Sequence, residues 1–250
     1  MGRKGGSHHL KRMAAPSYWP IHRKEFKWVA KPKPGPHPLN RGLPLLLVVR
    51  EKLGLVKTKR EAKVMLSDKQ VKVDGKTRCD GGFPVGLMDV VEIPAKNEAY
   101  RMLPAADGLI LYKIKKGEMN YKLCKIINKN TVKKGDVQLN LHDGRNVLVK
   151  LKDPKRPGED VYETSDTLKI KIPDGKVLKQ IKFRKGVTAI VTAGKNAGKW
   201  GRITRIRRGK GGQPTIVRLE DAKENKIQTT LSYTFAVGEE ESLISLPEEG

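Results

Sequence analysis

Hydrophobic and polar residues along this chain follow two periods, one typical of helices and one typical of strands. The first apolar run spans residues 43–53 and predicts a short buried helix. Pro44 suits the first turn of such a helix, because no hydrogen bond is required of its nitrogen there. Gly54 suits the position just after the last turn.

A second helix is predicted to begin at Lys59. Thr58 and Glu61 have the spacing of a capping box, in which the hydroxyl and the carboxylate each accept a hydrogen bond from the other residue's backbone amide. The helix then has an apolar face and a cationic face, formed by Ala62, Met65 and Leu66 and by Lys59, Arg60 and Lys63 respectively. A cationic helix face is most often only solvated, so this pattern alone does not establish a binding site.

Alternation with a period of two begins after this helix. Val71 and Val73 flank Lys72 and lead into a turn at Asp74–Gly75. Further strand patterns, separated by turn residues, lie at 90–93, 108–112, 122–127, 135–141, 146–150, 166–172, 186–194, 198–206, 215–219 and 230–238. Asp143–Gly144 predicts a type I′ hairpin turn.

These patterns predict an α+β, multidomain chain. We expect an extended basic arm over residues 1–41, a small α/β domain over 42–95, a central β-rich domain over 96–174 and a β-barrel with an acidic tail over 175–250. Each unit is close to the lower size limit for an independent core, so we expect a partner to contribute to stability.

The charge balance narrows the choice of partner. The chain has 52 Lys and Arg residues against 27 Asp and Glu residues, a formal net charge of +25. A surplus of this size repels itself unless a polyanion neutralises it, and nucleic acid is the obvious polyanion. No apolar run approaches the ~20 residues that cross a bilayer, and residues 1–9 lack the apolar core of a secretory signal. A membrane partner is therefore not expected.

Residues 1–41 combine ten Lys and Arg residues with a single acid, Glu25. Prolines at 32, 34, 36 and 38 favour an extended backbone, and a segment of this composition is not expected to fold alone. Four aromatic residues lie between the cations: Tyr18, Trp19, Phe26 and Trp28. The composition predicts an arm that orders on nucleic acid, with cations on phosphates and rings stacked on exposed bases.

Residues 175–219 contain thirteen Lys and Arg residues and no acid. Within them, 186–206 form a strand, a glycine-hinged loop and a strand, which resembles a KOW motif in an SH3-like barrel. Spaced glycines allow positive φ angles and let backbone amides approach phosphate. A Walker site is not predicted, because Ala193 occupies the first glycine position and Trp200 replaces the magnesium-binding Ser or Thr. The acidic residues 220–250 are expected to lie away from RNA.

No metal, cofactor or catalytic group is predicted. Cys79 and Cys124 are too isolated for a zinc site or a disulfide framework and are expected to be free thiols. His8 and His9 have no Cys or acid beside them that would complete a metal site. His142 has no nucleophile nearby in sequence and is expected in a turn.

Residues 43–94 resemble the S4-type RNA-binding domain. The resemblance consists of a polar cap, an Arg, an acid and an Ala at the start of a helix, followed by a V-x-V-D-G turn. It is carried by Thr58, Arg60, Glu61, Ala62, Val71, Val73, Asp74 and Gly75. The resemblance implies that Lys57, Arg60, Lys63 and the basic residues of the first hairpin strand face folded RNA.

The order of basic arm, S4-type domain, β scaffold and KOW module resembles the S4e family of small-subunit ribosomal proteins, found in archaea and eukaryotes. The phrases that carry this resemblance are residues 3–6, 9–12, 14–16, 34–37, 83–90 and 138–144. It implies a non-enzymatic, cytoplasmic component of the small ribosomal subunit that binds small-subunit rRNA and neighbouring ribosomal proteins and supports assembly and translation. No small-molecule substrate is implied.

Charge and resemblance together give a set of residues that we expect to bind RNA. They are Arg3, Lys4, Lys11, Arg12, Trp19, Arg23, Lys24, Lys27, Lys57, Lys59, Arg60, Lys63, Lys72, Lys76, Arg184, Lys185, Lys195, Lys199, Trp200, Arg202, Arg205, Arg207 and Arg208.

Two other classes of protein carry the same modules. RNA-modifying enzymes such as pseudouridine synthases, and tyrosyl-tRNA synthetases, have appended S4-type domains, but their catalytic signatures are absent from this sequence. Transcription elongation factors contain KOW modules, and co-sedimentation with polymerase in place of the small ribosomal subunit would favour that class.

Overall fold

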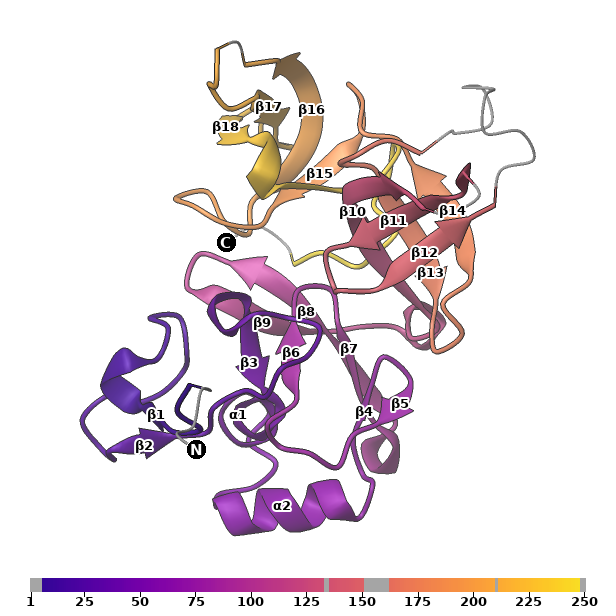
Figure 1. Ribbon diagram of the computed structural model, residues 1–250. Helices are drawn as coiled ribbons and strands as arrows, with labels where there is room; N and C mark the ends of the chain where they lie inside the picture. Colours follow the sequence, from indigo (N-terminus) through magenta and orange to yellow (C-terminus); the bar gives the residue numbers. More distant parts are fainter. Residues whose placement is uncertain (1–5, 133–134, 151–161, 210, 248–250) are drawn as a thin grey trace.

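The computed structural model describes residues 6–132, 135–150, 162–209 and 211–247, in which β-strands predominate (Figure 1). Three five-stranded antiparallel sheets form most of the molecule. Arg3, Lys4 and Lys210 lie outside the described residues.

The first sheet contains the predicted V-x-V-D-G hairpin. Its strand order is β5-β4-β7-β8-β9, with β4 at Lys72–Val73, β5 at Lys76–Thr77, β7 at Val90–Ile93, β8 at Glu98–Ala105 and β9 at Gly108–Lys113. Asp74 and Gly75 both have positive φ, 51° and 71°, as a tight hairpin turn requires. The expected boundary after residue 95 therefore falls inside this sheet, since the β7–β8 hairpin continues the same hydrogen-bonded ladder.

The predicted helix over residues 43–53 is wrong at its start. Leu43 and Pro44 belong to strand β3 (Gly42–Pro44), which pairs with β6 (Pro84–Gly86). The helix begins with α1 (Leu45–Leu47) and continues as one π-helical stretch over Val48–Lys52. Pairing with β6 holds Pro44 in an extended conformation, and the helix starts only after it. Gly54 follows the last turn with φ 60°, as predicted.

The second helix, α2, spans Lys59–Ser67 and begins where the capping box placed it. Thr58 Oγ1 accepts a hydrogen bond from the Glu61 amide at 3.2 Å, and the Glu61 carboxylate accepts one from the Thr58 amide at 3.4 Å. Because this carboxylate also accepts a hydrogen bond from the Lys57 amide, the pKa of Glu61 is lowered.

Residues 6–41 do not form an extended arm. Strands β1 (Leu10–Lys11) and β2 (Trp28–Val29) pair antiparallel, so the segment turns back on itself. The Arg23 guanidinium fixes the intervening loop by donating to the backbone carbonyls of Arg12, Ala15 and Pro16. Ala15 and Trp19 pack into the same core as α1 and the buried face of α2. Burial of these apolar side chains orders the segment on its own chain.

The second sheet has the order β12-β11-β10-β13-β14. Its strands are β10 (Tyr121–Thr131), β11 (Val137–Leu141), β12 (Asn146–Val149), β13 (Thr167–Lys171) and β14 (Val177–Ile181). The expected hairpin at residues 139–149 forms, but its turn is not type I′, because Gly144 has positive φ and Asp143 does not. Strand β14 lies beyond the expected boundary at residue 174, yet it belongs to the second sheet because it pairs with β13.

The third sheet has the order β18-β17-β16-β15-β19, so the last strand lies beside the first. Its strands are β15 (Thr188–Val191), β16 (Trp200–Arg207), β17 (Ile216–Glu220), β18 (Lys226–Thr230) and β19 (Thr234–Gly238). A 3-10 turn at Leu231–Tyr233 interrupts the strand expected over 230–238.

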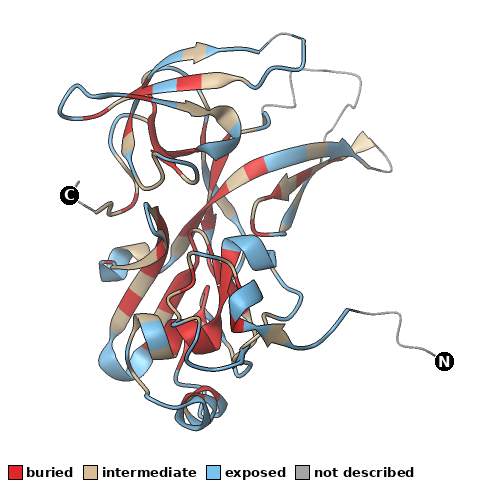
Figure 2. Ribbon diagram, turned by 90° about the vertical axis from the view of Figure 1, so that its left-hand side faces the viewer, coloured by how far each residue is buried: buried red, intermediate tan, exposed pale blue. Residues whose placement is uncertain are grey.

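Buried residues line the inner parts of the molecule (Figure 2), and one apolar cluster draws members from all three sheets. Leu103 of β8, Leu123 of β10 and Ile190 of β15 belong to one apolar cluster and are each fully buried. The three sheets therefore share a core, and the surfaces they carry are held in a fixed relation to one another.

Candidate nucleic-acid interface

Helix α2 lies at the edge of the molecule with its cationic face in solvent (Figure 1). Ala62 and Leu66 are buried, whereas Lys59, Arg60 and Lys63 are exposed. Within the described residues, none of these three cations has an ion-pair partner. Their charge is thus available to a polyanion outside the chain.

The hairpin β4–β5 carries the cations that follow the helix. Lys76 is exposed and Lys72 is half-buried, opposite Glu92 in the register of β4 and β7. Burial raises the pKa of Glu92. Arg78, which was not in the predicted set, lies with its guanidinium carbon 4.2 Å from the centre of the Phe83 ring.

Two expected RNA-binding residues of the N-terminal segment are structural. Trp19 is only 3% exposed, so its ring offers no face to a base. Arg12 is 5% exposed, and its guanidinium donates to the His22 carbonyl at 2.6 Å and to the Glu25 carboxylate at 3.0 Å. The expectation that Arg12 and Trp19 bind RNA is therefore wrong. The sequence alone could not show this, because an Arg or Trp that packs within its own chain looks the same in sequence as one that binds a partner.

Other groups on this segment do face solvent. Lys11, Lys24 and Lys27 are exposed. Phe26 and Trp28 are 62% and 49% exposed, and the Lys27 ammonium lies 5.3 Å from the centre of the Trp28 ring. The exposed aromatic rings of this segment are therefore Phe26 and Trp28, and not Trp19.

Strand β16 presents a row of cations in the third sheet. Arg202, Arg205 and Arg207 of β16 and Arg208 after it are exposed, while Ile203 is buried in the core. Arg184 and Lys185, which precede β15, are exposed as well. Lys195 and Lys199 are exposed on the preceding loop. Trp200 is half-buried and its indole nitrogen donates to the Pro247 carbonyl at 3.2 Å, so this ring packs on the end of the chain.

The glycines of the loop between β15 and β16 serve packing. Gly194 and Gly198 have φ angles of 87° and 86°. A Cβ at Gly198 would lie 2.8 Å from the Cα of Ala105, at the end of β8. The close approach that this glycine permits is therefore to the first sheet, and not to a phosphate as expected.

The acidic residues after β19 lie beside basic ones. Glu239, Glu240 and Glu241 share a cleft of about 690 Å³ with Arg184 and Arg202. The Glu239 carboxylate accepts a hydrogen bond from Lys179 at 2.8 Å, which lowers the pKa of Glu239. This part of the acidic segment is not remote from the expected RNA surface, and it partly neutralises that surface at one end.

A buried group of charges joins the first and second sheets. The Lys122 ammonium of β10 contacts Asp74 at 2.9 Å, Asp143 at 3.1 Å and Asp89. Arg145 adds a second cation, 2.6 Å from Asp74 and 3.1 Å from Asp143. The Lys122 side chain is 1% exposed, and the side chains of the three aspartates are at most 10% exposed. We refer to these five residues as the junction network.

The pKa values of the network follow from its pairing. Burial alone lowers the pKa of Lys122, but Asp89, Asp74 and Asp143 outweigh it and raise that pKa well above its usual value. Burial raises the pKa of Asp143, but its cationic neighbours, Lys122 foremost, lower the net value to about 2. Lys122, Asp89 and Asp143 are therefore ionised at neutral pH, and their charges are paired within the chain.

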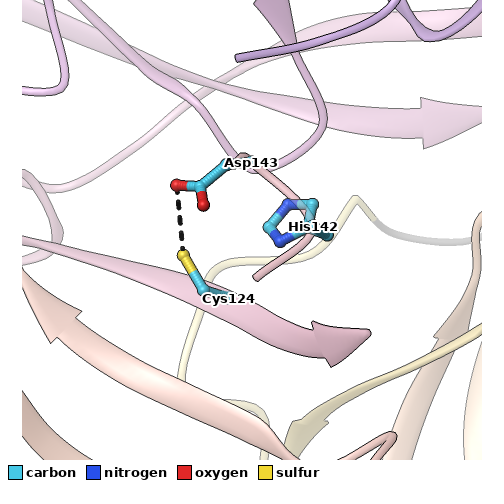
Figure 3. A group of neighbouring side chains, drawn as sticks. All are labelled: Cys124, His142 and Asp143. Atoms are coloured by element: carbon cyan, nitrogen blue, oxygen red, sulfur yellow. Dashed lines mark hydrogen bonds between the residues drawn. The ribbon is translucent and has the colours of Figure 1, made fainter. Parts of the chain in front are cut away.

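Cys124, His142 and Asp143 lie close enough to raise the question of a metal (Figure 3). Each group already has a partner: the thiol donates to Asp143 at 3.5 Å, and Nδ1 of His142 accepts from the Lys125 amide at 3.3 Å. The Lys122 ammonium repels a cation at Asp143. Burial raises the pKa of Cys124 well above its usual value, which favours the thiol over the metal-binding thiolate. These contacts favour a packing role.

Within the described part of the chain, no helix is both long and apolar enough to span a bilayer.

Comparisons with known proteins match the whole chain. Family models match in three consecutive parts: the RS4NT (NUC023) domain at residues 4–40, the S4 domain at 43–91 and Ribosomal family S4e at 96–177. The chain is 49% identical over 249 residues to the small ribosomal subunit protein eS4 of Desulfurococcus amylolyticus, covering 99% of both chains. It is 50% identical over 249 residues to that of Staphylothermus marinus, again covering 99% of both.

A solved structure is also similar. It is the crystal structure of the 30S ribosomal protein S4e from Thermoplasma acidophilum, with a TM-score of 0.65 and 31% sequence identity. The match covers 79% of this chain and 95% of that chain.

Proposed function

The chain belongs to the S4e family of ribosomal proteins, and from that premise we propose that it is a structural constituent of the small ribosomal subunit that binds small-subunit rRNA. The family is one of structural ribosomal proteins and not of enzymes. The alternative of an RNA-modifying enzyme is therefore excluded.

One observation carries the proposal most directly. The S4 domain presents Lys59, Arg60 and Lys63 on a solvent-facing helix, without ion-pair partners among the described residues. Three such cations at three- and four-residue spacing form a surface on which phosphates can bind. Phosphate contacts of this kind give affinity and orientation, and they do not require a catalytic group.

We propose that three surfaces bind RNA together. The N-terminal hairpin, the S4 domain and the third sheet, which we interpret as an SH3-like KOW module, each carry exposed cations. The proposed contact residues are Arg3, Lys4, Lys11, Lys24, Lys27, Lys57, Lys59, Arg60, Lys63, Lys72, Lys76, Arg184, Lys185, Lys195, Lys199, Arg202, Arg205, Arg207 and Arg208. Arg23 and Trp200 are left out, because the Arg23 guanidinium binds backbone carbonyls and the Trp200 ring packs on the end of the chain. Because the described sheets share a core, the contacts on one chain raise each other's effective concentration.

We further propose that the protein is cytoplasmic, contacts neighbouring ribosomal proteins and supports assembly of the subunit and translation. The names of the full-length relatives support this placement.

The test is the salt dependence of binding to small-subunit rRNA fragments. A protein that neutralises six to ten phosphates loses about 10³- to 10⁵-fold in affinity between 50 and 200 mM salt. We expect a steep decrease of this order. Affinity that stays constant across the range would contradict the proposal.

A sucrose-gradient profile separates this function from that of an elongation factor. We expect the protein in the small-subunit fraction, where crosslinking would identify its rRNA contacts. Co-sedimentation with RNA polymerase would overturn the proposal.

A further inference from the structure

A cleft of about 430 Å³ opens beside hairpin β4–β5, on the side where the first and second sheets meet. Its walls come from segments far apart in sequence: the turn after β4, the loop before β6, the turn between β11 and β12, and residues 35–36. The volume lies in the range of sites that hold one small organic group. The cations of α2 do not line it, so it is distinct from the proposed helix surface.

The acids in this cleft are already neutralised. Asp74, Asp89 and Asp143 belong to the junction network, and each contacts Lys122. Asp89 has a further partner in His37, whose Nε2 lies 3.0 Å from it. The carboxylates therefore contribute little free negative charge to the open part of the cleft.

The free charge at the rim is positive. Lys76 and Arg78 line the cleft, and neither has an ion-pair partner within the described residues. Lys76 is exposed on β5, where its ammonium can approach a ligand from solvent. The rim thus favours an anion over a cation.

The Arg78–Phe83 pair gives the cleft a flat, polarisable wall. The guanidinium carbon lies 4.2 Å from the centre of the Phe83 ring, and both residues line the cleft. The Arg78 Nε is buried and has no hydrogen-bond partner. A buried N–H without an acceptor is unfavourable, so a ligand acceptor that reaches it would be bound more tightly. Guanidinium groups both stack on planar rings and donate to phosphate.

We propose that this cleft holds one unpaired nucleotide of the bound RNA, with its base against the Arg78–Phe83 wall and its phosphate towards Lys76. This inference rests on the proposed function, because the nucleotide is part of an RNA strand. A paired base enters only after leaving its duplex, and it must give up its pairing and stacking to do so. The cleft consequently selects bulged or looped nucleotides, whereas the helix surface binds backbone phosphates of any sequence.

The experiment compares two RNA hairpins that differ by a single bulged uridine, using the full chain and fluorescence anisotropy. We expect the bulged hairpin to bind about tenfold more tightly, which corresponds to the stacking of one base. Arg78→Gln should remove this preference while leaving affinity for the fully paired hairpin unchanged. Lys76→Gln, at an exposed position, should reduce the preference without any risk to the fold.

The matched control is the double variant Lys115→Gln and Lys116→Gln, which removes two exposed charges outside the cleft. It should keep the full preference for the bulged RNA. Equal affinity of the unaltered protein for the two hairpins would overturn the inference and leave the proposed function standing. Failure to bind either hairpin would count against the proposed function itself. If an acidic peptide bound and its binding depended on Arg78 in the same way, the inference would be overturned, and the cleft would be assigned to a protein partner.

Discussion

The junction network and the cationic face of α2 both contain Lys and Arg, yet the first is buried and paired whereas the second is exposed and unpaired among the described residues. Lys122 is 1% exposed and contacts three carboxylates. Lys59, Arg60 and Lys63 are exposed and, among the described residues, have no ion pair. Net charge therefore indicates that the protein binds a polyanion, whereas burial and ion pairing decide which of its cations are free to contact that polyanion.

The two regions also differ in how their energies depend on surroundings. Buried pairs are little screened by salt, and removing one partner leaves an uncompensated charge in a medium of low polarity. Exposed cations are screened within roughly 8 Å at physiological ionic strength and contribute little to folding. Substitutions in the two regions should therefore change different measurements.

The largest expected effect comes from Lys122→Met. Loss of the ammonium leaves Asp74 and Asp143 paired with Arg145 alone and Asp89 with His37 alone, so the free energy of unfolding should fall by about 3–5 kcal/mol. Urea denaturation measures this. Lys63→Met is the control, and its stability should stay within about 0.5 kcal/mol of the original. A similar loss in both variants would remove the distinction between the two regions.

Acidification should destabilise the buried region around His142, beside the junction network, before it affects the exposed cations. Burial, with some repulsion from Lys122, lowers the pKa of His142 from 6.5 to about 4. Unfolding below pH 6.5 therefore takes up a proton, and stability present at pH 7.5 is lost as pH falls towards 4, by about 2 kcal/mol at pH 5. Urea denaturation at both pH values measures the loss.

The control for this pH effect is His142→Gln, which keeps a hydrogen-bonding side chain but does not titrate. The difference in stability between pH 7.5 and pH 5 should shrink in this variant. An undiminished difference would assign the acid sensitivity to other groups.

The smallest effect in free energy is expected from Arg60→Glu combined with Lys63→Glu. Both side chains lie on the exposed face of α2, so helicity and stability should be retained, while affinity for an rRNA fragment should fall about tenfold or more. Circular dichroism and a binding titration at fixed salt measure the two quantities. Loss of helicity would show that these side chains stabilise the fold, and binding that is not weakened would show that they do not contact the RNA. Either result would contradict the distinction between this face and the junction network.

The local features of the S4 domain could be predicted from sequence. The capping box set the start of α2 at Lys59, and the V-x-V-D-G pattern set the turn at Asp74–Gly75. Both depend on residues within four positions of one another, so no long-range information was needed.

The junction could not be predicted, because its members come from four separate segments. Asp74 looked like an ordinary turn residue, and Lys122 looked like one more surface lysine in a basic chain. Only the packing of the second sheet against the first brings Lys122 of β10 to Asp89. The same limitation explains Arg12 and Trp19, whose burial depends on how the N-terminal segment folds back.

The expected domain boundaries differ from the sheets for a related reason. Composition changes near residues 95 and 174, but hydrogen bonding continues from β7 into β8 and from β13 into β14. A strand joins a sheet by hydrogen bonding to the free edge of a neighbouring strand. The sequence of the added strand does not indicate which edge it will pair with.

The position of β19 beside β15 has a consequence for the order of events during synthesis. Thr188–Val191 leaves the polypeptide tunnel long before Thr234–Gly238, its partner in the ladder. Later still come Leu243, whose carbonyl accepts the Tyr121 hydroxyl, and Ser245, whose hydroxyl lies 2.5 Å from Glu118. A nascent chain can therefore complete its first sheet, with helix α2 in place, while its third sheet still has an open edge.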